Sequence, residues 1–254
     1  MRSRIVLFFA LTLALVIAVA GFAQQPAPAP AAQAGARGQA AAAPRPDPPE
    51  DHRPPVFFRE SWKNPPTQEP KVQQSDLQNQ NLELKLYGGP TIDVRIVIHT
   101  TPKDDPSYIW TGSSPVNWAL ALRDKDNYVD LSGPVAKIRW RTKQAAFNLL
   151  RPIVKLADGT YLVGDYTEGF TGDWRETEFS VASIHWRSFD SATCVTTRTV
   201  AGWIEHPDLS KVDEVGFTDL TRGSGGGAGG GSRIDWIEVY GNPVKRPAAT
   251  AAVK

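Results

Sequence analysis

The sequence predicts an all-β protein whose folded part is a single-domain β-sandwich. Short runs rich in β-branched and aromatic residues recur between clusters of Gly, Pro, Asn and Asp. Apolar residues show no helical period over more than a turn or two. Asp158-Gly159, between IVKLA and TYLVGDY, predicts a tight type I′ hairpin. Many short strands joined by such turns indicate a sandwich or barrel rather than β-α-β units.

The strand pattern appears first in a series of short segments that run from residue 56 to residue 190. Each contains Val, Ile, Phe, Tyr or Trp in its interior and ends near a turn-forming residue. In chain order they are VFFRESW, NLELKLYG, IDVRIVIHT, YIWTG, VNWALALRD, YVDLSG, AKIRWRT, LLRPIVKLADGTYLVGDY, DWRETEFSV and SIHWRSFD.

Two closing strands are expected on either side of a glycine-rich run. Val212, Val215 and Phe217 mark the first strand, and IDWIEVYG marks the second. Residues 223–232 between them are almost all Gly, Ser and Ala, so we expect a flexible loop at the rim of the sandwich. A phosphate-binding loop is not favoured, because the run leads into a strand rather than a helix.

The ends of the chain differ in composition from the middle. Residues 1–23 have the two arginines, apolar run and small-x-small motif of a secretory signal cleaved after Ala23, with an uncleaved membrane anchor as the alternative. Residues 24–55 are rich in Pro and Ala and are expected to form a disordered spacer. The β-sandwich domain is placed at residues 56–241 and a disordered tail at 242–254. The protein is therefore expected to be secreted or periplasmic in a bacterial envelope, without stable membrane insertion after cleavage.

Charge and cysteine content exclude several classes of function. The 28 Lys and Arg nearly balance the 27 Asp and Glu, which argues against a nucleic-acid-binding protein. Cys194 is the one cysteine, so neither an intramolecular disulfide nor a Cys-based zinc site is possible. It lies in the β-prone stretch SATCVTTRTV, where we expect a buried thiol rather than a nucleophile.

The second half of the domain resembles a known family. The order VDLSG, AKIRW, VKLADGTYL, GDWRETEFSV, PDLSKVDEVGF and RIDWIEVYG is similar to that of galactose-binding-like jelly rolls, especially carbohydrate-binding modules attached to polysaccharide-degrading enzymes. The resemblance implies a jelly-roll β-sandwich with a sugar ligand on a concave sheet face, and it makes a structural calcium ion under a rim loop plausible. This fold carries many functions, so the site must be argued separately.

Strand alternation predicts a basic face on the sandwich. In AKIRWRT, Ile138 and Trp140 pointing inward send Arg139 and Arg141 outward; in LLRPIVKLA the same reasoning sends Arg151 and Lys155 outward. If the two strands share a sheet, these cations form one stripe suited to uronate or sulfate groups. Two carboxylates on the DWRETEFSV strand, Glu176 and Glu178, are the alternative partners of these arginines.

The eight tryptophans are the second indication of a sugar site, because indole rings stack on sugar faces. Trp140 and Trp236 lie in strong strand patterns and are expected in the core. Trp110 and Trp174 border turns and are expected to be exposed, which makes them candidate ligand-binding residues.

The sequence gives weaker indications of a catalytic site or a metal site than of a sugar-binding site. Hydrolysis would need a carboxylate pair, but sequence does not give the separation of the two groups. Asp124, Asp126 and Asp130 offer oxygen ligands at loop-like spacing for calcium, without the fixed Gly and Glu of an EF-hand. The carboxylate candidates are Asp213 with Glu214, Asp235 with Glu238, and Glu176 with Glu178.

These observations favour an exported protein that binds a polysaccharide through Arg139, Arg141, Arg151, Trp110 and Trp174, and the three arginines would suit an anionic polysaccharide. No catalytic residue is assigned. A glycoside hydrolase or polysaccharide lyase on the same fold, and an envelope interaction module without a sugar ligand, remain open as alternatives.

Overall fold

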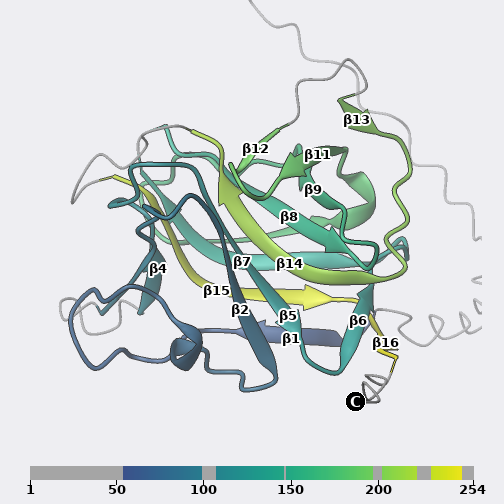
Figure 1. The fold of residues 1–254 in the computed structure, drawn as a ribbon, viewed down its shortest axis with the longest axis horizontal. Coiled ribbons are helices and arrows are strands. Elements are labelled where there is room, and N and C mark those ends of the chain that lie inside the picture. Colours follow the sequence, from purple (N-terminus) through teal and green to yellow (C-terminus); the bar gives the residue numbers. More distant parts are fainter. Residues whose placement is uncertain (1–53, 99–106, 146, 197–201, 222–229, 248–254) are drawn as a thin grey trace, which may run out of the picture. The chain divides into compact units, whose positions relative to one another are not determined.

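The computed structural model describes residues 54–98, 107–145, 147–196, 202–221 and 230–247, which form two antiparallel sheets (Figure 1). The first sheet has the order β10-β7-β15-β4-β3, and β1 pairs with β15. Its strands are β1 (Val56–Glu60), β3 (Arg95–Val97), β4 (Tyr108–Trp110), β7 (Lys137–Gln144), β10 (Arg175–Ser180) and β15 (Ser232–Tyr240).

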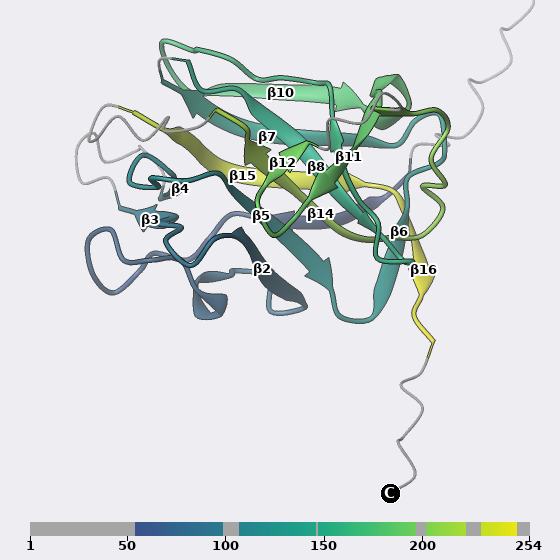
Figure 2. The ribbon, with the colours of Figure 1, turned by 45° about the horizontal axis from the view of Figure 1, so that its top comes forward.

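The second sheet has the order β12-β11-β9-β8-β14-β5-β2, with β13 beside β11 and with β6 beside both β14 and β16. The chain crosses repeatedly between the two layers, as the views in Figure 1 and Figure 2 show for β5, β7, β8 and β10. The all-β jelly-roll sandwich predicted from the sequence is confirmed. The strands are β2 (Leu82–Gly88), β5 (Trp118–Asp124), β6 (Asn127–Asp130), β8 (Leu150–Leu156), β9 (Tyr161–Gly164), β11 (Trp186–Asp190), β12 (Val195–Thr196), β13 (Trp203–Ile204), β14 (Val212–Asp219) and β16 (Asn242–Lys245).

The core lies between the sheets and follows from strand alternation. On β7 every second residue is buried, beginning with Ile138 and Trp140, while the residues between them are partly exposed. Val154 of β8 and Phe217 of β14 meet them from the other sheet, in one continuous apolar cluster. The inward and outward assignments predicted for β7 and for Leu150 and Val154 are therefore confirmed.

The hairpin between β8 and β9 is present, but its turn is not type I′. Asp158 does not have a positive φ, whereas Gly159 has a φ of 92°. The Gly159 N–H donates to the Leu156 carbonyl, and the Leu156 N–H donates to the Thr160 carbonyl. This is the pattern of a three-residue loop in which a type I turn is followed by a left-handed glycine. The Asp158 carboxylate accepts the Thr160 N–H, which stabilises the turn.

The expectation that the chain is unstructured from residue 242 is wrong for its first residues. Asn242–Lys245 forms β16 and pairs with β6 (Figure 2). Arg246 then lies over the Tyr128 ring at 4.1 Å and donates to Asp213. The sandwich thus uses this segment as an edge strand.

Helical structure is limited to two short 3-10 turns within the described ranges, Gln74–Asp76 and Val181–Ser183. The expected absence of amphipathic helices is confirmed for that part of the chain. Among the residues placed by the structure, no helix has the length and apolar character needed to span a membrane. The predicted signal segment, residues 24–53 of the predicted spacer, residues 222–229 of the glycine-rich run and residues 248–254 of the predicted tail lie outside the described residues.

Candidate functional site

Arg139 and Arg141 lie on the outer face of the first sheet, where both form ion pairs. Arg139 donates to Glu176 at 3.2 Å and to Glu238 at 3.3 Å, and it lies 3.6 Å from Glu178. Arg141 donates to Asp235 at 2.7 Å. The alternative in which Glu176 and Glu178 neutralise these arginines is therefore confirmed for Arg139, with carboxylates of β15 added. Cross-strand pairs of this kind stabilise an exposed sheet and leave little charge for a ligand.

Arg151 and Lys155 do not share that face, so the single basic stripe is wrong. Arg139 and Arg141 belong to β7 in the first sheet, whereas β8 pairs with β9 and β14 in the second. Both strands point their cations away from the same core, and the cations therefore emerge on opposite sides of the sandwich. Alternation within each strand was correct, but it does not say which sheet a strand joins.

The two tryptophans singled out from the sequence behave differently. Trp110 is only 8% exposed, because it packs with Val97 and Tyr108 and its indole N–H donates to the Gly230 carbonyl, so the prediction of an exposed ring is wrong. Trp174 is partly exposed, packs edge-on against Tyr108 and lies under the Arg141 guanidinium. Trp110, Arg139 and Arg141 thus belong to the first sheet, Trp174 directly precedes its strand β10, and Arg151 is on the other sheet.

The expected core tryptophans are both buried, but in different places. Trp140 lies between the sheets and has no exposed surface. Trp236 is 6% exposed on the outer side of the first sheet, where the guanidinium groups of Arg59 and Arg139 cover its ring at 4.6 and 5.5 Å. A local bulge in β15 between Ile234 and Trp236 explains this placement.

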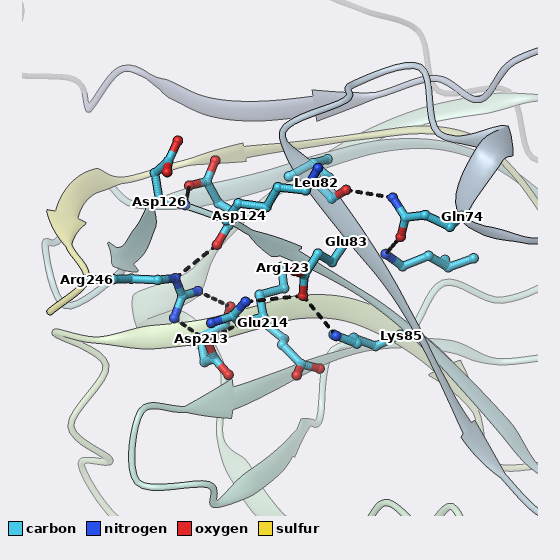
Figure 3. Close-up of polar contacts among 12 residues, drawn as sticks. Gln74, Leu82, Glu83, Lys85, Arg123, Asp124, Asp126, Asp213, Glu214 and Arg246 are labelled. Atoms are coloured by element: carbon cyan, nitrogen blue, oxygen red, sulfur yellow. Dashed lines mark hydrogen bonds and ion pairs between the residues drawn. The ribbon is translucent and has the colours of Figure 1, made fainter. Parts of the chain in front are cut away.

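The outer face of the second sheet carries a network of paired charges on β2, β5, β8 and β14 (Figure 3). Arg123 bridges Glu83 at 3.1 Å and Asp213 at 3.0 Å. Lys155 contacts Asp213 at 3.3 Å and Glu214 at 3.0 Å. Each cation of this network thus has a carboxylate partner, so we call it the compensated network.

The protonation states of two groups in this network are fixed near neutral pH. Burial alone would raise the pKa of Asp213, but the hydrogen bonds from Arg123 and Arg246 outweigh it and hold the pKa below its usual value. Burial and the 2.6 Å hydrogen bond to Glu214 raise the pKa of Tyr87. Asp213 therefore stays ionised and Tyr87 stays protonated near neutral pH, so Asp213 has no proton to donate as a general acid and Tyr87 is not available as a general base.

A different arrangement lies farther along the same face, where Arg151 lies near Arg187 and the Arg187 guanidinium covers the exposed Trp203. Arg187 lies in β11, where its strand neighbours are Val163 of β9 on one side and Trp203 of β13 on the other. Its guanidinium lies 4.7 Å from the centre of the Trp203 ring. Trp203 is 50% exposed, the most exposed tryptophan of the described residues. We call Arg151, Arg187 and Trp203 the arginine–tryptophan cluster.

The two guanidinium groups of the cluster are not neutralised by ion pairs. Within the residues described by the structure, neither arginine has a carboxylate oxygen within 4.0 Å. Arg151 reaches the carbonyls of Gly164 and Asp165 at 3.4 Å, and Arg187 donates to the Gly202 carbonyl at 3.2 Å. Burial lowers the pKa of Arg151, the nearby charges of Asp165 and Asp219 partly oppose this shift, and the charge of Arg187 adds to it, yet an arginine remains protonated. The cluster is therefore a cationic site beside an open aromatic ring.

Sequence reasoning placed Arg151 correctly on an outward face but missed its neighbours. Trp203 stands in AGWIEHP, flanked by Gly202 and Pro207 as Trp110 is flanked by turn residues, so the same signal was present. Arg187 alternates with Trp186, which is 1% exposed, so its outward direction could be read from SIHWRSFD.

The calcium candidates do not form a site. Asp124 accepts the N–H groups of Asp126 and Asn127, and Asp130 accepts the N–H and hydroxyl of Ser132. These carboxylates hold local turns. In the described part of the chain, no group of three or more His, Cys, Asp or Glu side chains is arranged to hold a metal ion.

Cys194 is fully buried, as expected, in a small apolar cluster on the outer side of the second sheet. Burial raises the pKa of its thiol to about 12. The thiolate that a nucleophile requires is therefore scarce at neutral pH.

Comparison with known proteins gives a similarity at low sequence identity. No protein-family model matches the chain, and no curated protein matches it. The family 11 carbohydrate-binding module of a cellulosomal cellulase of Clostridium thermocellum is 16% identical, with a TM-score of 0.40 over 68% of this chain and 94% of the module.

Two further solved structures are also similar to this chain at low sequence identity. A family 11 module from Clostridium thermocellum in complex with a β-1,3-1,4-mixed-linked tetrasaccharide is 16% identical, with a TM-score of 0.41 over 70% of this chain and 98% of the module. An exo-β-agarase is 10% identical, with a TM-score of 0.37 over 71% of this chain and 25% of the agarase. No residue role is transferred from these proteins, and the site rests on this chain's own side chains.

Proposed function

We propose that this protein binds an anionic polysaccharide at the arginine–tryptophan cluster and does not cleave it. The observation that carries the proposal is the contrast between two pairs of arginines. Arg139 and Arg141 are held by carboxylates, whereas Arg151 and Arg187 have none within ion-pair distance among the described residues. A planar guanidinium suits the carboxylate of a uronate or a sulfate group through two parallel hydrogen bonds.

Trp203 supplies the second element of sugar recognition. Its ring is half exposed beside Arg187, so a pyranose whose acid group reaches the arginines can stack on the indole. Binding of this kind orders few protein groups, because Arg187 is already held by the Gly202 carbonyl and by the ring.

Export of the protein to the cell envelope is part of this proposal. It is supported by the signal-like composition of residues 1–23 and the Pro/Ala-rich residues 24–55. A spacer of that composition would hold the sandwich away from a surface to which polysaccharide is attached.

Affinity electrophoresis with a polysaccharide panel tests the proposal. Gels would contain polygalacturonate, alginate, a sulfated galactan and neutral glucans, and each polymer would also be assayed for new reducing ends and unsaturated products. We expect retardation by at least one acidic polymer, weaker at high salt because exposed charge interactions are screened, and no product. Product release would establish an enzyme instead, and no retardation by any polymer would favour an interaction module without a sugar ligand.

A further inference from the structure

A pocket of about 820 Å³ opens at the edge of the sandwich beside Trp203. It lies between the turn Val181–Ser183, strand β13 and the segment that leads into β14. Its volume is within the range of about 300–1,000 Å³ that is usual for small-molecule sites. Val181, Ile184 and Leu209 give it an apolar lining and are each less than 10% exposed.

The polar groups of the pocket differ in charge from the arginine–tryptophan cluster. The lining contains no Lys or Arg and one carboxylate, Glu205, together with Ser132, Ser183, His185 and His206. Hydroxyl, imidazole and carboxylate groups on an apolar lining suit the hydroxyls of a neutral sugar. An anionic group would meet Glu205 without a compensating arginine in the pocket.

Trp203 connects the pocket with the cluster. The Arg187 guanidinium covers one face of the indole, and the His185 ring packs edge-on with its centre 6.2 Å away. Half of the Trp203 surface is still exposed, and Trp203 lines the pocket whereas Arg187 does not, so part of the ring surface is open to a ligand in the pocket.

From these observations we infer that the pocket is a second subsite that takes a neutral pyranose of the same glycan, adjacent to the residue whose acid group binds Arg151 and Arg187. This inference rests on the proposed function. The recognised unit would then contain an acidic sugar next to a neutral one, and the pocket alone would bind neutral oligosaccharides weakly.

The indole signal of Trp203 provides a direct test. With isotopically labelled tryptophan, the Trp203 Nε1–H peak is assigned from Trp203→Phe, and the protein is titrated with tetrasaccharides of β-1,4-linked glucose, xylose and mannose and with tetragalacturonate. At least one neutral tetrasaccharide is expected to move the Trp203 peak. If none does while tetragalacturonate binds, the pocket inference is overturned and the proposed function stands.

Two variants that fill the pocket make the test specific. Ala182 and Ser183 are exposed on the 3-10 turn and line the pocket, so Ala182→Trp and Ser183→Phe should block it without disturbing the core. Each is expected to weaken neutral binding by roughly tenfold or more, the loss typical of removing a well-buried ligand contact. The matched control is Ala192→Trp, an exposed position outside the pocket lining.

The arginines separate the two proposals. Arg151→Gln, which leaves the Arg187–Trp203 contact in place, should leave neutral binding within about twofold while weakening tetragalacturonate by at least roughly tenfold. If Ala182→Trp and Ser183→Phe both bind the neutral tetrasaccharide as the wild type does and melt at the same temperature, the pocket is not a sugar subsite. This conclusion holds for any result with the arginine variant. Unchanged tetragalacturonate binding by the arginine variant contradicts the proposed function alone.

Discussion

At the residue scale, the partners of each charge decide what that charge can do. Asp213 is 12% exposed in its side chain and receives hydrogen bonds from Arg123 and Arg246. It therefore ties β14 to β5 and to the segment after β16. A carboxylate with this many cationic neighbours contributes to stability rather than to chemistry.

Replacement of Asp213 by Asn is expected to lower the free energy of unfolding at pH 7 by about 3 kcal/mol, because two partly buried guanidinium groups lose their common anion. Since the folded-state pKa of Asp213 is depressed, its contribution is complete above the unfolded pKa and is lost as the pH falls through the folded value. Urea unfolding from pH 7 down to pH 2 should show the gap between wild type and variant closing at acid pH. A gap independent of pH would mean that the charge is not the cause.

Gly216 is required by a close approach of two strands. A Cβ at this position would lie 2.0 Å from the backbone oxygen of Leu120, and a carbonyl of a central strand cannot move independently. Gly216→Ala is therefore expected to destabilise the protein by about 3 kcal/mol, the upper part of the range for overpacking. Gly133→Ala, where nothing lies within 4 Å, is the control and should be near neutral. Equal melting temperatures for the two variants would contradict the packing described for β14 and β5.

At the element scale, the sequence patterns predicted the interior strands correctly but missed the edge strand β16. Alternation predicted β7 and β8 and the direction of their side chains, because that pattern is local to each strand. β16 was missed, since NPVK is short and has a proline at its second position, which an edge strand tolerates. The pairing of β16 with β6 and the contact of Arg246 with Asp213 depend on residues more than 30 positions apart, which no local pattern contains.

Truncation after Gly241 is expected to lower the melting temperature by several degrees, roughly the effect of 1–3 kcal/mol in a domain of this size. The deletion removes β16 and leaves Asp213 without Arg246. Truncation after Pro247 keeps both contacts and should melt as the full chain does. The two melting curves, recorded by circular dichroism, check this directly, and identical curves would show that β16 does not stabilise the sandwich.

At the scale of the whole molecule, the two outer faces have different electrostatic character. On the first sheet, Arg139 and Arg141 each form an ion pair with a carboxylate of a neighbouring strand. On the second sheet, Arg123 forms ion pairs, whereas Arg151 and Arg187 form none within 4.0 Å among the described residues. The sequence indicated arginines and tryptophans as the binding groups, and the structure shows which of them meet. That distinction depends on sheet assignment, so strand patterns alone could not make it.

The most direct measurement compares two double variants that each remove two positive charges. Arg151→Gln with Arg187→Gln and Arg139→Gln with Arg141→Gln would be titrated calorimetrically with the acidic polymer that retards the wild type most. The first pair is expected to weaken binding roughly tenfold to hundredfold, because it removes hydrogen bonds between charged groups, and the second to change it less than about twofold. Equal losses of affinity in the two double variants would mean that only the net charge of the protein matters. A larger loss in the Arg139 and Arg141 variant would mean that the ligand binds the opposite face, which would contradict a site at Arg151 and Arg187.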